Sequence, residues 1–270
     1  MDEFPNVNPA EAYEQYLGPA IAEPFSRMLL DRAAPRQGQH ILDLACGPGI
    51  VARRVAPMVG IEGRVVALDI SPAMLDVARA LPAPAGAAIE WLQGDAIALD
   101  LPDKAFDLVL CQQGLQFFSD RKAALREMRR VLAVDGRAVL SVWRGLEHHP
   151  FYEGLFRAIS RRFALEVSDL DVSFSLGHTE DLQALLIDAG FSHREIEECS
   201  LDVRFPIPSR FVQITVLGAA TSIPAFARLS LSARSEIIDT ISCELAPLID
   251  RYSRAETLEF QMSTHLVVAA

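Results

Sequence analysis

Residues 40–50 read HILDLACGPGI, and this stretch decides the fold. Its first half, His40–Leu44, is a short apolar run that predicts a buried strand. Glycines follow at positions 47 and 49, and a helix is expected from about Gly49 to Met58. A glycine-rich turn between a strand and a helix lets the backbone approach a ligand closely. We therefore expect a ligand site at the carboxyl end of this strand.

Short apolar strands alternate with amphipathic helices on the carboxyl side of this loop. The further strands are predicted at Arg64–Asp69, Ala88–Leu92, Phe106–Cys111 and Ala138–Trp143. Ser71-Pro72 and Ser119-Asp120 favour helix starts, and Asp135-Gly136 predicts a turn into the last of these strands. This alternation is typical of a parallel sheet with helices on both faces. The sequence thus predicts an α/β, Rossmann-like, doubly wound fold.

The flanking segments are predicted to be mainly helical and to belong to the same single domain. Two N-terminal helices, Glu11–Leu17 and Ile21–Ala33, are expected to be separated near Gly18-Pro19. The later elements are predicted helices at His178–Ala189, Ser209–Ala220 and Ser230–Arg254, and strands at Glu195–Phe205 and Leu258–Ala269. The domain of residues 1–270 then comprises an N-terminal helical lid (1–36), a ligand-binding core (37–145) and a substrate-side half (146–270) with a helical insert at about 207–256.

The composition is that of a globular protein without a membrane span. The 270 residues are 50% hydrophobic and 23% charged, and no apolar run is long enough to cross a bilayer. The first ten residues, MDEFPNVNPA, lack the basic start and apolar centre of a secretion signal, so a cytoplasmic location is expected. The net charge of −11 disfavours binding to nucleic acid. The four cysteines form no C-x-x-C pair, and no metal site is expected.

The glycine loop is compatible with two kinds of cofactor. Gly47, Gly49 and Ala52 fit the loose dinucleotide pattern G-x-G-x-x-A, which would suit NAD. Asp43 stands just before the loop, and its carboxylate would repel a pyrophosphate at the helix start. The same carboxylate suits a cationic amino group, such as the one on the methionine end of S-adenosylmethionine. We favour S-adenosylmethionine and keep an NAD-dependent oxidoreductase as an alternative.

Acidic residues also follow the second and third predicted strands. Asp69 can accept hydrogen bonds from ribose hydroxyls, or it can cap the helix that begins next. Ile70 and Met74 would lie beside an adenine, or they pack in the core. Asp95 can accept from the adenine amino group while the Ala96 amide donates to a ring nitrogen, although a turn aspartate is common. The combination of three acids after three successive strands favours a methionine-and-adenosine site.

Five motifs carry a family resemblance. They are LDLACGPG (42–49), ALDIS (67–71) followed by Met74, QGDA (93–96), FDLVLCQQGLQFF (106–118) and LREMRRVLAVDGRAVLSVW (125–143). Together they resemble class I S-adenosylmethionine-dependent methyltransferases, in particular the small-molecule branch that includes the ubiquinone/menaquinone C-methyltransferases. The likeness covers roughly residues 38–145 and is weaker in the N-terminal helices and the last strand. It implies a seven-stranded, mostly parallel sheet with an antiparallel last strand, and a helical insert that serves as a lid.

The resemblance also implies roles for individual residues. S-adenosylmethionine would be the cofactor and S-adenosylhomocysteine the product. At the methionine part of the cofactor we expect Asp43, Ala45, Gly47 and Gly49, together with the backbone of Gln112. Asp69 would bind the ribose, Ile70 and Met74 would lie beside the adenine, and Asp95 and Ala96 would form its hydrogen bonds. Gln113 and Gln116 would lie near the reaction centre, and Tyr16 would close over the cofactor. Tyr13 and Tyr16 could instead simply pack.

The implied activity is methyl transfer to a small, moderately apolar molecule through an O, N or C atom. The sulfonium already activates the methyl group, so alignment and exclusion of water matter most. If the acceptor must lose a proton, His148 and His149 are the candidate catalytic bases, and His178 is a further candidate. The aromatic region Phe151–Phe174 and the segment Ser209–Arg254 would either roof the acceptor or fill a core.

Two further alternatives concern partners and chemistry. The segment Cys111–Gly114 lacks the acidic or Asn residue, the Pro-Pro pair and the aromatic residue of amino-methylating DNA enzymes. The substrate is therefore expected to be a small molecule and not a nucleic acid, and no insertion into a membrane is expected. A homodimer is compatible with the sequence. The chain could also bind S-adenosylmethionine without methylating, as a cyclase would.

Overall fold

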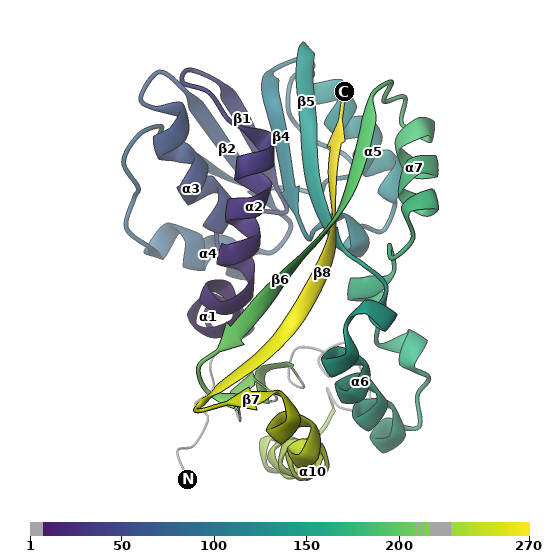
Figure 1. Cartoon of the computed structure of the whole chain (residues 1–270). Coiled ribbons are helices and arrows are strands. Elements are labelled where there is room, and N and C mark those ends of the chain that lie inside the picture. The colour runs from purple at the N-terminus through teal and green to yellow at the C-terminus, as the bar shows by residue number, and fades with distance from the viewer. Residues whose placement is uncertain (1–7, 209, 212, 216–227) are drawn as a thin grey trace.

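The structure is a computed structural model that describes residues 8–208, 210–211, 213–215 and 228–270. One sheet runs through the molecule in the order β3-β2-β1-β4-β5-β8-β6, and helices lie on both of its faces (Figure 1). The predicted helix Ser209–Ala220 falls largely on residues outside these ranges. Every described helix is too short or too polar to cross a lipid bilayer.

The parallel part of the sheet confirms the predicted α/β fold. Its strands are β1 (His40–Leu44), β2 (Arg64–Asp69), β3 (Ile89–Gln93), β4 (Phe106–Gln112) and β5 (Leu132–Trp143). The C-terminal strand β8 (Thr257–Ala269) pairs antiparallel with both β5 and β6 (Arg194–Phe205). A two-residue strand, β7 (Ser253–Arg254), extends the pairing of β8. The predicted mostly parallel sheet with an antiparallel last strand is therefore confirmed.

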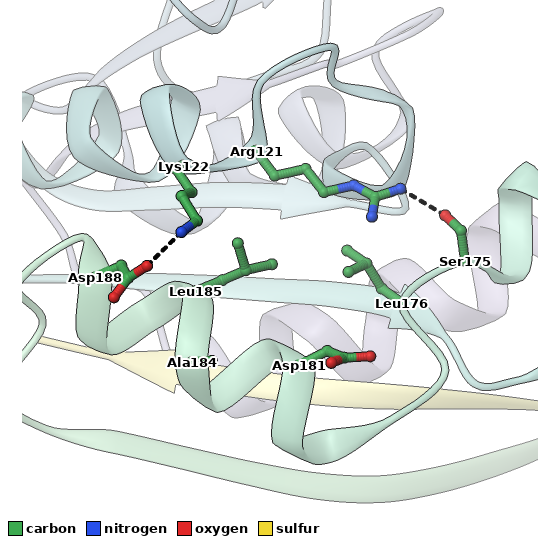
Figure 2. Close-up of a pocket in the computed structure, with 8 residues that line it drawn as sticks. All are labelled: Arg121, Lys122, Ser175, Leu176, Asp181, Ala184, Leu185 and Asp188. Carbon is green, nitrogen blue, oxygen red and sulfur yellow. Dashed lines mark hydrogen bonds and ion pairs between the residues drawn. The ribbon is translucent and has the colours of Figure 1, made fainter.

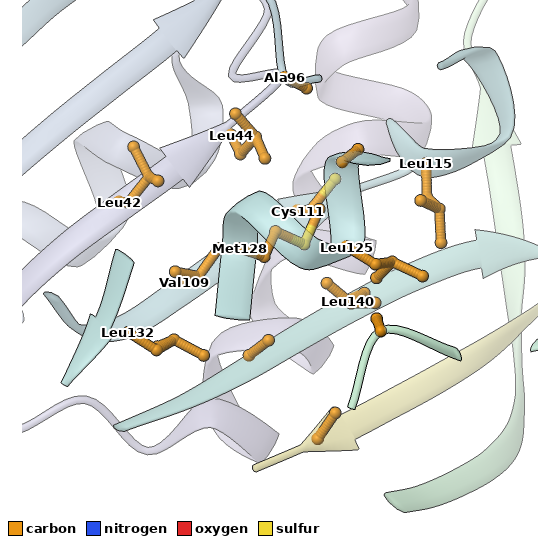
Figure 3. Packing of buried hydrophobic residues seen from close by; sticks show 14 of the residues in the cluster. Leu42, Leu44, Ala96, Val109, Cys111, Leu115, Leu125, Met128, Leu132 and Leu140 are labelled. Carbon is orange, nitrogen blue, oxygen red and sulfur yellow. The ribbon is translucent and has the colours of Figure 1, made fainter. Parts of the chain in front are cut away.

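Helices bury apolar faces against the two sides of the sheet. On one side lie α2 (Glu23–Ala33), α3 (Ile50–Val59) and α4 (Pro72–Ala80), and on the other α5 (Arg121–Val131) and α7 (Thr179–Asp188). Apolar residues recur at helical spacing on α5, where Leu125 and Met128 are fully buried. Figure 3 shows them packed against Val109, Cys111 and Leu140 of the neighbouring strands.

Strands β6 and β8 continue as a two-stranded ribbon beyond the carboxyl end of β5 (Figure 1). The last β5–β8 pair is Trp143 with Thr264, whereas the β6–β8 pairing continues to Phe205 and Leu258. Helices α6 (Pro150–Phe163) and α10 (Leu231–Tyr252) lie at this end. Their apolar side chains form, with the ribbon, a distal cluster whose buried aromatic members are Phe25, Trp143, Phe151, Phe156, Phe174, Phe205, Phe211 and Phe260.

The predicted break between the N-terminal helices is wrong. Helix α1 (Pro9–Ala12), the π-helical segment η1 (Tyr13–Ala22) and α2 follow one another without a gap. Pro19 lies inside η1, where the wider turn relieves the clash between a proline ring and the preceding turn of an α-helix. At the end of η1 the Glu23 amide still donates to the Gly18 carbonyl. Such π-helical turns are frequent at functional sites.

The turn predicted at Asp135-Gly136 is also wrong. Strand β5 already begins at Leu132, which pairs with Phe106, and the regular pairing resumes between Leu108 and Arg137. The intervening residues form a bulge inside the strand. A Cβ atom on Gly136 would lie 2.9 Å from the Phe106 carbonyl oxygen, so only glycine fits this close approach.

Candidate cofactor and acceptor site

The glycine loop joins β1 to α3 in a left-handed conformation. The φ angles are 56° at Ala45, 54° at Gly47 and 87° at Gly49. The two glycines differ in their surroundings. A Cβ on Gly49 would collide with the ring of Trp91, whereas no atom lies within 4 Å of the corresponding position on Gly47. Gly49 is thus required by packing, and Gly47 leaves open space in front of the loop.

Asp43 lies buried beneath the loop and is only half satisfied. Its Oδ2 accepts a hydrogen bond of 2.9 Å from the Ala52 amide, while Oδ1 is buried without a partner among the described residues. Burial raises the pKa of Asp43 to about 8, the Ala52 hydrogen bond opposes this rise, and the charge of Asp69 adds to it. An approaching cation would pair with Oδ1 and favour the ionised carboxylate. The site therefore fits a ligand with an ammonium group.

Asp69 connects the loop to the start of α4. Its Oδ2 accepts from the Gly47 amide at 2.7 Å and its Oδ1 from the Ser71 amide at 2.8 Å. The cap of α4 is Ser71, whose hydroxyl accepts from the Met74 amide, so Asp69 does not cap this helix. Each carboxylate oxygen of Asp69 keeps acceptor capacity for a hydroxyl group. The neighbouring Ile70 side chain is 64% exposed at this edge, while Met74 is half-buried. An exposed apolar side chain beside an acid suits a flat ring attached to a sugar.

The third acid, Asp95, sits in a local turn after β3. Its Oδ1 accepts from the Ile97 amide at 3.1 Å, the contact of a turn aspartate, and its side chain is half-buried. Ala96 is buried and packs in the apolar cluster between the sheet and α5. The structure therefore brings the three predicted acids to the same carboxyl edge of the sheet, because β1, β2 and β3 are parallel neighbours.

A small cavity of about 50 Å³ opens in front of the glycine loop. Its lining residues are Tyr13, Ala22, Asp43, Ala45, Cys46, Gly47, Pro48, Ile50, Val51 and Gln112. Small-ligand sites usually measure about 300–1,000 Å³, so this cavity corresponds to only part of a cofactor site. A larger cavity of about 290 Å³ lies between α5 and α7, away from the loop (Figure 2).

Tyr13, and not the predicted Tyr16, lines the cavity on the side of η1. Burial raises the pKa of Tyr13 to about 12, and the charges of Glu14 and Asp69 add to this rise. Tyr16 packs instead against the distal cluster, with the Arg210 guanidinium 5.9 Å from its ring centre. The sequence places both tyrosines on one helix, but the π-helical register decides which one faces the loop.

Gln112, Gln113 and Gln116 gather at the carboxyl end of β4. The Gln112 Nε2 donates to the Ala22 carbonyl at 2.9 Å and so connects β4 to η1. Gln113 has a φ of 54°, and its Nε2 donates to the Thr264 hydroxyl at 3.1 Å. Gln116 is 1% exposed, and its Nε2 donates to the Gln113 Oε1 at 3.3 Å. Of the three glutamines, only Gln112 lines the loop cavity.

The contacts of His149 are structural, and they argue against its predicted role as a catalytic base. Its Nδ1 is 3.1 Å from the Gly145 carbonyl and its Nε2 accepts from the Ser263 amide at 3.0 Å. Burial lowers the pKa of His149 to about 4, against the opposing effect of the nearby Gly145 and Ser263 carbonyls. Both nitrogens are thus engaged. His148 is half-buried, with its Nε2 3.4 Å from Glu147, and His178 is exposed before α7.

The aromatic side chains of the distal cluster pack mainly on one another. Phe151 stacks on Phe260 with ring centres 4.9 Å apart, and Tyr152 lies 5.5 Å from Phe174. Trp143, at the end of β5, contacts the ring of Phe25 edge-on at 4.8 Å. These rings are buried against one another beyond the end of β5 and are here called the aromatic wall; none of them lines either of the two cavities. No group of three or more metal-ligating side chains lies together in the described part of the chain.

Comparison with known proteins gives the family. The methyltransferase domain family matches residues 41–136, which hold the glycine loop and all three acids. The chain is 33% identical over 184 residues to the 2-phytyl-1,4-naphtoquinone methyltransferase of Synechococcus elongatus, covering 62% of this chain and 77% of the relative. It is 31% identical over 182 residues to the ubiquinone/menaquinone biosynthesis C-methyltransferase UbiE of Shewanella frigidimarina, covering 62% and 72%.

A solved structure extends the likeness to the whole fold. The phosphoethanolamine N-methyltransferase 2 of Haemonchus contortus, in complex with phosphomonomethylethanolamine and S-adenosylhomocysteine, superposes with a TM-score of 0.56 at 19% identity. The match covers 96% of this chain and 56% of that protein. The predicted alternative of an NAD-dependent oxidoreductase thus finds no support in the family. The chain belongs to the class I S-adenosylmethionine-dependent methyltransferases and resembles the quinone C-methyltransferases among them.

Proposed function

We propose that this methyltransferase acts on a small aromatic acceptor that carries hydroxyl groups, in the manner of a reduced quinone. The observation that carries this proposal is the apolar aromatic wall of the distal cluster, which begins at Trp143 beside the polar glutamines after β4. A flat acceptor would bury its ring against the wall and turn its polar atoms toward the amides. The relatives named above are a 2-phytyl-1,4-naphtoquinone methyltransferase and a C-methyltransferase of ubiquinone/menaquinone biosynthesis, which supports the same class of acceptor.

The cofactor-binding residues follow from the contacts at the carboxyl edge. We assign the unpaired Oδ1 of Asp43 to the ammonium group and the open space at Gly47 to the methionine backbone. Asp69 would accept from the ribose hydroxyls, and the exposed Ile70 would cover one face of the adenine. Asp95 has an oxygen free of the Ile97 contact that can accept from the adenine amino group.

The chain contributes alignment and exclusion of water to the reaction. When bound, S-adenosylmethionine supplies an electrophilic methyl group, so an electron pair of the acceptor forms the new bond while the carbon–sulfur bond breaks and leaves its electrons on sulfur. An electron-rich hydroquinone is a better partner for this methyl group than the electron-poor quinone. The aromatic wall excludes water, and η1 closes the cofactor side. We assign His148 the transfer of the released acceptor proton to solvent, because it is half-buried and not enclosed by the backbone.

The test combines calorimetry with product analysis. We expect heat on titration with S-adenosylmethionine or S-adenosylhomocysteine and none with NAD. The wild-type protein should convert 1,4-dihydroxynaphthalene, kept reduced, to a product that is one methyl group heavier by mass spectrometry. In a screen of other substrates, turnover without the gain of one methyl mass would instead support the cyclase alternative. Homodimer formation can be checked in the same preparation by light scattering, and the predicted cytoplasmic location by cell fractionation.

A further inference from the structure

The cavity between α5 and α7 takes no part in the proposed function. Its volume of about 290 Å³ equals that of about ten water molecules at about 30 Å³ each, so it admits a ligand of about ten non-hydrogen atoms. Leu176, Ala184 and Leu185 supply its apolar surface, and Leu176 is 2% exposed. A ligand of this size would bury an apolar part against these side chains.

Four charged side chains border the same cavity, two of each sign. Arg121 and Lys122 belong to α5, and Asp181 and Asp188 belong to α7 (Figure 2). The Lys122 Nζ lies 2.6 Å from the Asp188 Oδ2, and this contact lowers the pKa of the Asp188 carboxyl. Lys122 and Asp188 therefore satisfy each other at one end of the cavity. The charges of Arg121 and Asp181 remain at the other end.

The Arg121 guanidinium is held in place through a single nitrogen. Its Nη2 donates to the Gln116 carbonyl at 2.8 Å and to the Ser175 hydroxyl at 2.6 Å, which uses both of its hydrogens. The Ser175 hydroxyl donates to the Val172 carbonyl, so it can only accept from Arg121. The N–H groups on Nε and Nη1 of Arg121 have no acceptor among the described residues. Figure 2 shows one of these nitrogens pointing into the cavity.

Asp181 faces the cavity from the first turn of α7. Its side chain is exposed, and in the described part of the chain it forms neither a hydrogen bond nor an ion pair. Its charge nevertheless acts on Arg121, since burial lowers the pKa of the guanidinium and the Asp181 carboxylate opposes this effect. The two groups are thus close enough to interact through space, but they do not bond directly.

This pattern of charge selects one class of ligand. A phosphate or sulfate ion at Arg121 would be repelled by the Asp181 carboxylate. A neutral apolar molecule would cover both charges without providing either with a partner, which is costly. A zwitterion can pair its anionic group with Arg121 and its cationic group with Asp181, while an apolar part covers the leucines.

We propose that this cavity binds a free α-amino acid with an apolar side chain. The carboxylate of the amino acid accepts from Nε and Nη1 of Arg121, its ammonium group donates to Asp181, and its side chain lies on Leu176 and Leu185. The site shares no lining residue with the cavity at the glycine loop, so an amino acid and the cofactor can bind together. The inference does not depend on which molecule accepts the methyl group.

The experiment titrates L-leucine into the full-length protein saturated with S-adenosylhomocysteine and follows the ligand by saturation-transfer NMR. Leucine is used because free methionine could also enter the cofactor site. We expect a Kd below about 1 mM. 4-Methylpentanoate lacks the ammonium group and 3-methylbutan-1-amine lacks the carboxylate, and each should bind at least tenfold more weakly than leucine. Inorganic phosphate at the same concentration as leucine should not displace it.

Two variants with matched controls locate the site. Asp181→Asn should weaken leucine binding at least tenfold without weakening that of 4-methylpentanoate, a difference that a general loosening of the fold would not produce. Glu180→Gln changes the net charge equally on the preceding residue, which does not line the cavity, and should bind leucine like the wild type. Ala184→Phe fills the cavity and should abolish binding, whereas Gln183→Phe adds the same bulk beside it and should not.

The outcomes are independent of the proposed methyl transfer. A wild-type Kd above about 1 mM, leucine binding that survives in Asp181→Asn, or binding of 4-methylpentanoate as tight as that of leucine overturns the amino-acid site. Because S-adenosylhomocysteine occupies the glycine loop throughout, none of these results bears on the methyl acceptor. A protein that binds leucine as expected but does not methylate 1,4-dihydroxynaphthalene supports the amino-acid site and overturns the proposed reaction on that acceptor.

Discussion

Replacing Asp43 by asparagine should stabilise the cofactor-free protein and impair cofactor binding. The folded pKa of about 8 lies above the ordinary value of 3.8, so the folded state keeps a proton that the unfolded chain releases. The stabilising contribution of the Asp43 proton is then fully present below pH 3.8, is lost between pH 3.8 and about 8, and is absent above. The distance from 3.8 to pH 7 is about three pKa units, or at most about 4 kcal/mol at about 1.4 kcal/mol per unit.

The variant has no ionisable group at position 43, so it avoids this loss of stability at pH 7. Its amide group introduces a smaller destabilisation of another kind. Its amide oxygen can still accept from the Ala52 amide, but its NH2 group would lie where Oδ1 is now buried without a partner. An unpaired buried donor costs about 1–3 kcal/mol. The free energy of unfolding at pH 7 should therefore rise by about 1–3 kcal/mol in Asp43→Asn. Urea unfolding at pH 5, 6, 7 and 8 should show a steeper decline for the wild type than for the variant.

Cofactor binding gives the complementary readout. A carboxyl with a pKa of about 8 is about 90% protonated at pH 7, so pairing with an ammonium group should release close to one proton. Calorimetry in buffers of different ionisation enthalpy measures this number directly. The wild-type affinity should increase about tenfold between pH 6 and pH 7, and Asp43→Asn should bind at least tenfold more weakly at pH 8. Equal affinities and no proton release would refute the assigned role of Asp43.

Three further predictions concern other parts of the structure. Gly47→Ala should lower the free energy of unfolding by about 1 kcal/mol and weaken cofactor binding at least tenfold. Gly49→Ala should lower the free energy of unfolding further, because its Cβ meets the Trp91 ring. Urea unfolding measures the stability of both variants, and calorimetry measures their affinity. Arg130→Ala removes donors to the carbonyls of the loop after β3 and should lower the free energy of unfolding by about 2 kcal/mol, with cofactor affinity unchanged. Because the pKa of His149 is lowered to about 4 from 6.5, stability should fall as the pH drops through this interval, by about 2 kcal/mol at pH 5, and His149→Gln should remove this dependence in acid unfolding curves.

The sequence predicts the local parts of this fold well and the long-range parts less well. The bounds of His40–Leu44 and Arg64–Asp69 match the prediction because short apolar runs between turn residues leave few other structures. Pro19 misled the prediction of the N-terminal helix, since a π-helical turn accommodates it. The bulge before Arg137 was missed because it depends on the register with β4.

In the candidate site, too, the features set by local sequence were predicted and those set by long-range contacts were not. Asp43, Asp69 and Asp95 could be placed from sequence because each lies within two residues of the carboxyl end of a parallel strand. The contacts of His149 with Ser263 and of Gln113 with Thr264 join residues more than 100 positions apart, and no local pattern announces them. Only the folded ribbon shows that the His149–Ser263 contact is structural and that the Gln113–Thr264 contact orients an amide.

The ribbon of β6 and β8 has a consequence for how such an enzyme can diversify. The family match ends at residue 136, before the ribbon begins, and the ribbon joins the rest of the sheet only as far as the Trp143–Thr264 pair. Substitutions and insertions beyond this pair can reshape the distal cluster without moving the loop under which Asp43 lies. Duplicated copies of the gene could therefore acquire new acceptors through mutations in the ribbon and the distal cluster alone. The glycine loop and Asp43, which hold the methyl donor, would stay unchanged.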